Sequence, residues 1–78
     1  MSEKPPVGPR IVPVRAVPIE LCQLLKFGGL AATGGEAKAV ISAGKVLLNG
    51  TVETQKRKKL QAGDRVTCDG QTVEVRVG

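Results

Sequence analysis

The amino-acid sequence predicts an α+β fold, in which two short helices pack on a small, mostly antiparallel sheet. The first half holds two helical stripes of apolar residues, and the second half holds two hairpin signals, Asn49-Gly50 and Asp69-Gly70. Residues 71–77 alternate between apolar and polar side chains, as a strand with one buried face does. A chain of 78 residues has room for one small domain but not for a large enclosed active site.

The first ten residues are rich in proline, a composition that favours extended or disordered chain over helix. We therefore expect a flexible proline-rich tail over residues 1–10 and a folded domain over residues 11–78. Residues 11–17 are rich in β-branched side chains, which favours a strand. Because Pro13 has no N–H group to donate, this strand is expected at the edge of the sheet.

A first helix is predicted from Pro18 to Phe27. Pro18 suits the first helical position, and a pair of glycines follows Phe27 and ends the helix. Lys26 lies outside the apolar stripe and is expected to face solvent. The stripe itself consists of Leu21, Leu24 and Leu25.

A second helix is predicted over residues 33–43 by signals at both of its ends. The Thr33 hydroxyl can accept a hydrogen bond from the N–H of Glu36, while the Glu36 carboxylate accepts one from the N–H of Thr33, a reciprocal capping box. Gly44 is placed to end the helix in a left-handed conformation. The apolar stripe of this helix consists of Ala37, Val40 and Ile41.

The second half of the chain is predicted to form strands joined by tight turns. Residues 45–48 and 51–54 are expected to pair across the Asn49-Gly50 turn, because both turn positions tolerate a positive φ. Residues 55–59 contain four consecutive cations, which cannot share a buried face. A basic loop is therefore predicted there.

Two more strands follow a turn at Gly63-Asp64. Residues 65–68 and 71–77 are expected to pair across Asp69-Gly70. The last strand is expected to have one buried face and one solvent-exposed face. The buried face consists of Val73, Val75 and Val77, and the exposed face consists of Thr72, Glu74 and Arg76.

The chain is basic, with 12 lysines and arginines against 7 aspartates and glutamates and a net charge of +5. This excess indicates either an anionic partner or simply good solubility, and nucleic acid is the commoner partner of a small basic domain. The chain has no Trp or Tyr and only one Phe, Phe27, so a stacking platform for splayed single-stranded bases is essentially absent. Sequence reading by base stacking is therefore not expected.

The chain contains no histidine, which removes the usual general base near neutral pH and the commonest metal ligand. Cys22 and Cys68 are far apart in the sequence and lack companion ligands, so a zinc site would have too few donors. We expect no enzymatic activity, no metal site and no cofactor. Two buried free thiols in a reducing cytosol are the preferred interpretation, and a disulfide is the alternative.

No apolar run approaches the ~18 residues of a membrane span. The N-terminus also lacks the uninterrupted apolar segment of a signal peptide. We therefore expect a cytoplasmic protein that acts as a monomer away from membranes.

The order of these elements resembles one known family. After a helix and a capped helix come the patterns Gly-x-Val-x-x-Asn-Gly and, beyond the basic loop, Leu-x-x-Gly-Asp-x-Val. This order is similar to the RNA-binding domain of the ribosomal protein S-four type, also called the αL motif, and especially to its short stand-alone bacterial members. The resemblance covers about residues 11–77. The matching residues are Leu21, Leu24, Leu25, Glu36-Ala37-Lys38, Ile41, Gly44, Val46, Asn49-Gly50, Leu60, Gly63-Asp64 and Val66.

The resemblance implies a protein that docks on structured RNA, such as ribosomal RNA or a hairpin, through a basic face and without catalysis. It implies RNA contacts by Lys38 on the second helix, by Lys45 at the helix-to-strand junction and by the basic loop from Lys56. The RNA-binding candidates are Lys26, Lys38, Lys45, Lys56, Arg57, Lys58 and Lys59.

The sequence departs from the family pattern on the helices. Longer members often carry basic residues on the first helix and just inside the second, where this chain has Glu20, Gln23 and Gly34. These departures shift the emphasis to the basic loop, whose charges release counterions from phosphates whatever the base sequence. Arg57 can grip a phosphate with its planar fork, whereas the lysines act as point charges. A merely solvated charged loop is the alternative interpretation.

The glycine pair Gly34-Gly35 also has two interpretations. The free N–H groups of the first helical turn can approach a phosphate, helped by the helix dipole. Alternatively the pair is simply a flexible helix start, which the carboxylate of Glu36 at the same end favours.

Two other functions compete with RNA binding. A small sulphur-carrier protein with a ubiquitin-like fold shows similar short strands and turns, but such carriers end in Gly-Gly whereas this chain ends in Val77-Gly78. Its C-terminal glycine would carry the activated group. The other alternative is an adaptor that binds an acidic protein surface.

Overall fold

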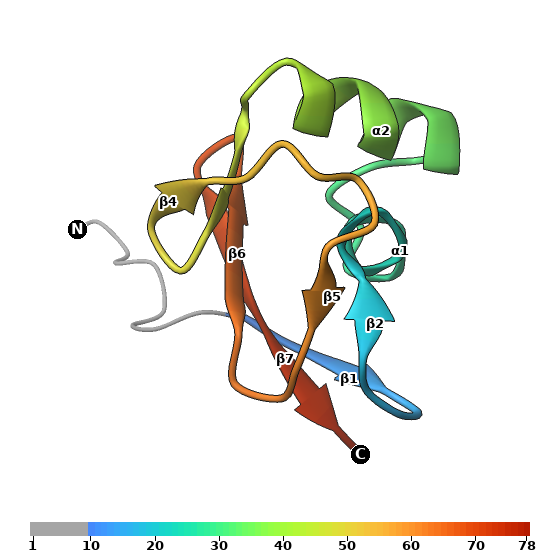
Figure 1. The fold of residues 1–78 in the computed structure, drawn as a ribbon. Helices are drawn as coiled ribbons and strands as arrows, with labels where there is room; N and C mark the ends of the chain where they lie inside the picture. The colour runs from blue at the N-terminus through green and yellow to red at the C-terminus, as the bar shows by residue number, and fades with distance from the viewer. Residues whose placement is uncertain (1–9) are drawn as a thin grey trace, which may run out of the picture.

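The structure, a computed structural model, describes residues 10–78 and confirms the predicted α+β architecture (Figure 1). The predicted tail lies outside the described residues, apart from Arg10, which is the first residue of a strand and not part of a tail. In chain order the elements are β1 (Arg10–Val14), β2 (Ile19–Glu20), α1 (Leu21–Phe27), α2 (Gly34–Ser42), β3 (Val46–Leu48), β4 (Thr51–Val52), β5 (Lys59–Leu60), β6 (Arg65–Cys68) and β7 (Gln71–Val77).

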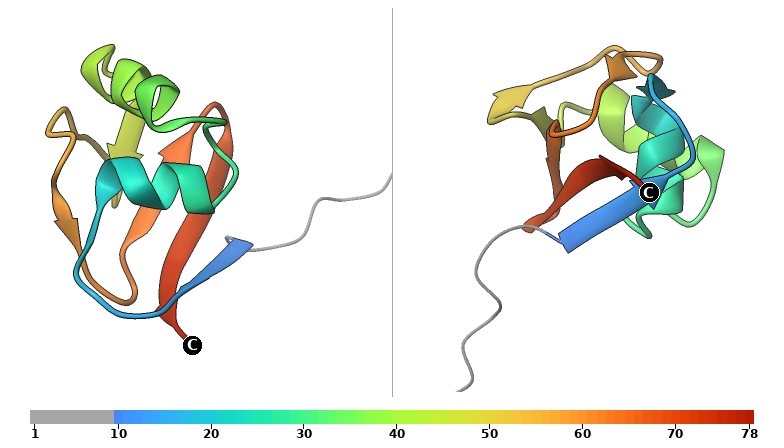
Figure 2. Two further views of the ribbon diagram at one scale, coloured as in Figure 1. Left: turned by 90° about the vertical axis from the view of Figure 1, so that its right-hand side faces the viewer. Right: turned by 90° about the horizontal axis from the view of Figure 1, so that it is seen from below.

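Five strands form one sheet in the order β1-β7-β6-β3-β4, and β2 and β5 form a separate two-stranded ribbon. Neighbouring strands are antiparallel except β1 and β7, which run parallel. β1 stands at one end of the order, which confirms the edge position that Pro13 indicated. Both helices lie on the same side of the five-stranded sheet (Figure 2).

The core lies between this sheet and the helices. Every member of the predicted α1 stripe is fully buried, and in α2 Ala37 and Ile41 are fully buried while Val40 is half-buried. Val77, expected on the buried face of β7, is instead exposed at the end of this strand, whereas Val73 and Val75 are buried as expected. The strands of the five-stranded sheet contribute Val12, Val14, Val46, Val66, Cys68, Val73 and Val75 to the core.

Helix α1 begins at Leu21, three residues later than predicted. Ile19 and Glu20 are extended and form β2, which pairs with β5. Tertiary pairing therefore overrides the local signal of Pro18, as it often overrides propensity. The same pairing places Lys59 in β5, so Lys59 is not part of the predicted loop.

Helix α2 has the predicted position, and its N-terminal cap is only partly as predicted. The Thr33 hydroxyl accepts a hydrogen bond of 3.1 Å from the N–H of Glu36, as expected. The Glu36 carboxylate, however, accepts from the N–H of Ala32 at 2.6 Å and not from Thr33, so it caps one residue further out. Gly44 has a φ of 75°, which confirms the predicted left-handed end of the helix.

The hairpin signals are confirmed. Asp69 and Gly70 both have positive φ, and β6 and β7 have the predicted bounds. β3 begins at Val46 and not at Lys45, because the Lys45 N–H donates to the Val40 carbonyl in the turn that ends α2. β4 is also two residues shorter than predicted.

The side chain of Asn49 ties two turns together. Asn49 and Gly50 have φ of 52° and 87°, as predicted for this turn. Asn49 Oδ1 accepts from the Arg65 N–H at 2.9 Å, and its Nδ2 donates to Asp64 Oδ1 at 3.3 Å. Asp64 Oδ2 in turn accepts from the N–H of Gln61 at 2.8 Å. The Asn-Gly turn and the Gly63-Asp64 turn are therefore held in a fixed relation.

A small charge network lies on the sheet face that points away from the helices. Glu74 Oε2 is 3.0 Å from Arg76 Nη2, and its Oε1 is 3.4 Å from Nε of Arg65, the cross-strand neighbour. The hydrogen bond from Arg76 is the main cause that lowers the pKa of Glu74, and the charges of both arginines act in the same direction. The carboxylate is therefore favoured over the neutral acid.

The two thiols are free and buried, as expected for unpaired cysteines of the core. Cys68 faces the core from β6, and Cys22 lies in the first turn of α1. Burial is the main cause that raises the pKa of the Cys68 thiol, and the charge of Asp69 adds to it. Cys68 is therefore a protonated core residue near neutral pH.

Replacing Asn49 by Ala is expected to lower the free energy of unfolding by about 2 kcal/mol, through strain at positive φ and loss of the two side-chain hydrogen bonds. Asp69→Ala is the matched control, since Asp69 has a similar φ of 56° but is not part of this network. We expect the control to lose about 1 kcal/mol in urea denaturation. Equal losses would show that the network adds no stability.

The lowered pKa of Glu74 predicts how stability depends on pH. The unfolded chain protonates this carboxyl near its ordinary pKa of 4.5, and the folded chain protonates it at a lower pH. The stabilisation is therefore complete above pH 4.5 and is lost as the pH falls through the folded pKa. Thermal denaturation should show that Glu74→Gln flattens the loss of stability on acidification. A variant that follows the wild-type pH profile would contradict this assignment.

Candidate functional site

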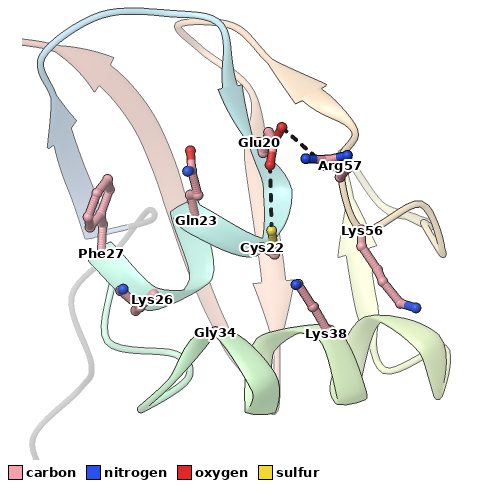
Figure 3. A pocket seen from close by; sticks show the side chains of 9 residues that line it. All are labelled: Glu20, Cys22, Gln23, Lys26, Phe27, Gly34, Lys38, Lys56 and Arg57. Atoms are coloured by element: carbon pink, nitrogen blue, oxygen red, sulfur yellow. Dashed lines mark hydrogen bonds and ion pairs between the residues drawn. The ribbon is translucent and has the colours of Figure 1, made fainter.

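An open groove of about 810 Å³ lies between α1, α2 and the turn that precedes β5 (Figure 3). We call it the basic groove. It is lined by Glu20, Cys22, Gln23, Lys26, Phe27, Gly34, Lys38, Lys56 and Arg57.

Main-chain hydrogen bonds hold the basic turn, residues 55–58, against the beginning of α1. The N–H of Leu21 donates to the carbonyl of Lys58 at 2.9 Å, and the N–H of Cys22 donates to the carbonyl of Lys56 at 3.1 Å. N–H groups in the first turn of a helix have no partner inside the helix, so an external acceptor is needed. The turn supplies these acceptors, which places its side chains beside α1.

An ion pair between an exposed arginine and a half-buried glutamate crosses the groove from the turn to β2. Arg57 Nε is 3.5 Å from Glu20 Oε2, and the Arg57 side chain is 82% exposed. The other carboxylate oxygen, Oε1, accepts a long hydrogen bond of 3.9 Å from the Cys22 thiol. Exposed pairs of this kind contribute at most about 1 kcal/mol. The guanidinium is therefore free to turn toward another anion at little cost.

The two helices add one lysine each. Lys38 projects from α2 toward α1 and the Cys22 side chain, and Lys26 lies in the last turn of α1 (Figure 3). Both side chains are exposed because α1 and α2 direct their apolar stripes into the core. The groove thus receives cations from three separate segments, with the Glu20 carboxylate among them.

The structure brings together part of the predicted RNA-binding set. Lys26, Lys38, Lys56 and Arg57 line the basic groove. The other three candidates are exposed but do not line it. They are Lys45 after the end of α2, Lys58 at the end of the basic turn and Lys59 in β5.

The groove also contains residues that the sequence did not identify as contacts. Glu20, Gln23 and Gly34, which stand where longer family members are often basic, all line it. The departures from the family pattern are therefore concentrated in this groove. Phe27 lies at its rim and is 62% exposed. Helix periodicity predicts that Phe27 is exposed, since Phe27 does not continue the buried leucine stripe of α1.

The side chains of the groove suit anion binding. They offer ammonium and guanidinium groups and the Gln23 amide, together with a single carboxylate. Among residues 10–78, no group of three or more His, Cys, Asp or Glu is arranged to hold a metal ion. Within the same part of the chain, no helix has the length and apolar character needed to cross a membrane.

Comparison with known proteins identifies relatives over most of the chain. The family model described as S4 domain matches residues 12–76. "Putative RNA-binding protein YbcJ" of Escherichia coli (strain K12) and "Uncharacterized protein YbcJ" of Shigella flexneri are each 46% identical over 57 residues, or 73% of this chain and 81% of theirs.

A solved structure agrees with this assignment. The solution structure of YbcJ from E. coli, described as revealing an αL motif involved in RNA binding, matches this fold with a TM-score of 0.71 at 36% identity. The match covers 99% of this chain and 98% of that chain. Both the sequence and the arrangement of the elements therefore lead to one conclusion: the chain belongs to the S4 domain family.

Proposed function

We propose that this protein binds structured RNA, such as ribosomal RNA or a hairpin, through the basic groove and without catalysing a reaction. The observation that carries the proposal is that α1, α2 and the basic turn bring Lys26, Lys38, Lys56 and Arg57 around one open groove. The relatives support it, since one is named an RNA-binding protein and its structure is described as an RNA-binding motif.

Phosphates are the groups that such a groove recognises. Neutralising RNA phosphates releases condensed counterions, which provides affinity that depends on salt and little on base sequence. Arg57 can take two phosphate oxygens with its planar fork, and the three lysines act as point charges. Because main-chain hydrogen bonds fix the turn against α1, the backbone that carries Lys56 and Arg57 is in position before RNA arrives.

The competing functions have weaker support. A ubiquitin-like sulphur carrier would act through Gly78, yet the match to the S4 domain gives that alternative no support. An adaptor for an acidic protein surface would use the same charges, but RNA binding is what the relatives are named for. In our proposal the protein acts as a cytoplasmic monomer.

Replacing Lys56 and Arg57 together by Gln is expected to lower the affinity for a labelled RNA hairpin by about tenfold or more, because it removes two phosphate contacts. Fluorescence anisotropy over a range of salt concentrations measures this. The wild-type slope of log affinity against log salt should be about −3 for four cations, and the double variant should be shallower by about 1.5 to 2.

The matched control replaces Lys58 and Lys59 by Gln, which removes the same charge from the same segment but outside the groove. We expect this control to lose much less affinity than the groove variant, with the melting temperatures of both variants unchanged. Equal losses would show that the overall charge of the segment binds RNA. An unchanged affinity in the Lys56/Arg57 variant would refute the groove as the binding site.

Glu20→Gln is expected to raise RNA affinity about two- to fivefold at low salt, because it removes the groove carboxylate that competes for Arg57. Glu74→Gln, with the same charge change on the other sheet face, should leave the affinity nearly unchanged. The gain should disappear in high salt. Weaker binding by Glu20→Gln would show that the carboxylate instead holds Arg57 in its binding orientation.

A further inference from the structure

A second hollow of about 540 Å³ adjoins the basic groove. It lies between the connection from β1 to β2 and the outer face of α1, and its walls include Pro13, Pro18 and Ile19. We call it the apolar hollow. Gln23 and Phe27 line both the apolar hollow and the basic groove, so these two side chains form the boundary that the two sites share.

We infer that Phe27 and the apolar hollow receive one unpaired nucleobase of the RNA whose phosphates lie in the basic groove. This inference rests on the proposed function and adds a substrate class to it: a folded RNA in which an unpaired nucleotide, such as a bulge, adjoins a helical stem.

The exposure of Phe27 is the first argument. It is the only aromatic residue of the chain, and 62% of its surface is exposed although it ends a helix whose leucines are fully buried. Figure 3 shows the ring at the rim of the groove, with the side chains of Lys26 and Gln23 nearby. An aromatic face that stacks on a base strengthens binding, and it does so for any base.

The composition of the hollow is the second argument. A nucleobase has two apolar faces and a polar edge. The prolines and Ala16 offer apolar surface for the faces, while the Gln23 amide and the Arg15 guanidinium can reach polar groups. A base inside a helix already has both faces stacked and its pairing edge occupied, so only an unpaired base is available.

Continuity with the basic groove is the third argument, because it decides the occupant. The sugar-phosphate backbone links each base to a phosphate a few bonds away. A phosphate near Lys26 can therefore place its own base close to the Phe27 ring, since both side chains line the same groove. A free nucleobase, which carries no phosphate, would gain nothing from this adjacency.

The test uses two RNA hairpins that carry the same phosphates. One has a single bulged nucleotide in its stem, and the other has an abasic residue at that bulge. We expect the wild-type protein to bind the bulged base about five- to tenfold more tightly than the abasic RNA, as one stacked base provides. Phe27→Leu should bind both RNAs equally, at the level of the abasic RNA, and should fold normally because the side chain is exposed.

A Phe27→Trp variant gives a direct readout of contact. The chain has no Trp or Tyr, so the new indole is its only strong fluorophore. We expect the bulged base to quench its emission and to bind at least as tightly as it binds wild-type protein, because indole stacks well. The abasic RNA should bind without this quenching.

The outcomes separate this inference from the proposed function. Three results would each overturn the base site. The wild-type protein could bind the two RNAs equally, or the preference for the bulged base could survive Phe27→Leu. The third result is an equal loss of affinity for both RNAs in that variant. In all three cases the RNA still binds and the Lys56/Arg57 variant still binds it more weakly. Binding of neither RNA to wild-type protein would refute the proposed function and this inference together.

Discussion

Two main-chain hydrogen bonds between the beginning of α1 and the basic turn determine the position of the candidate site. The N–H groups of Leu21 and Cys22 need acceptors, and the carbonyls of Lys58 and Lys56 provide them. Because these bonds use only backbone atoms, the side chains of the turn are free to point into solvent and the groove. The same contact anchors α1, a helix of seven residues that is too short to be stable alone.

The stability of the fold and the proposed RNA binding depend on different residues. The buried side chains are apolar or thiols, and among residues 10–78 no charged side chain is buried. The lysines and arginines of residues 10–78 lie on the surface, where their mutual repulsion is screened by salt. Changes to the charge of the groove can therefore alter binding while the core stays intact, which makes the groove variants informative.

The sequence predicted those features that neighbouring residues determine. The apolar stripes, the Asn49-Gly50 turn and the bounds of β6 and β7 follow from helix and hairpin rules that act within a few residues. The pairing of β2 with β5 could not be predicted, because it joins Ile19 to Leu60 across forty residues without a local signal. The groove depends on that pairing, so the sequence could name its cations but could not show that only some of them converge.

The parallel pairing of β1 with β7 has a consequence for biosynthesis. Val12 pairs with Val75 and Val14 pairs with Val77, so the two strands come from opposite ends of the domain. During translation the apolar side chains of β1 stay uncovered until the ribosome has released β7. The nascent chain therefore carries an unpaired apolar strand for most of the synthesis of this domain, and such a strand is prone to aggregate.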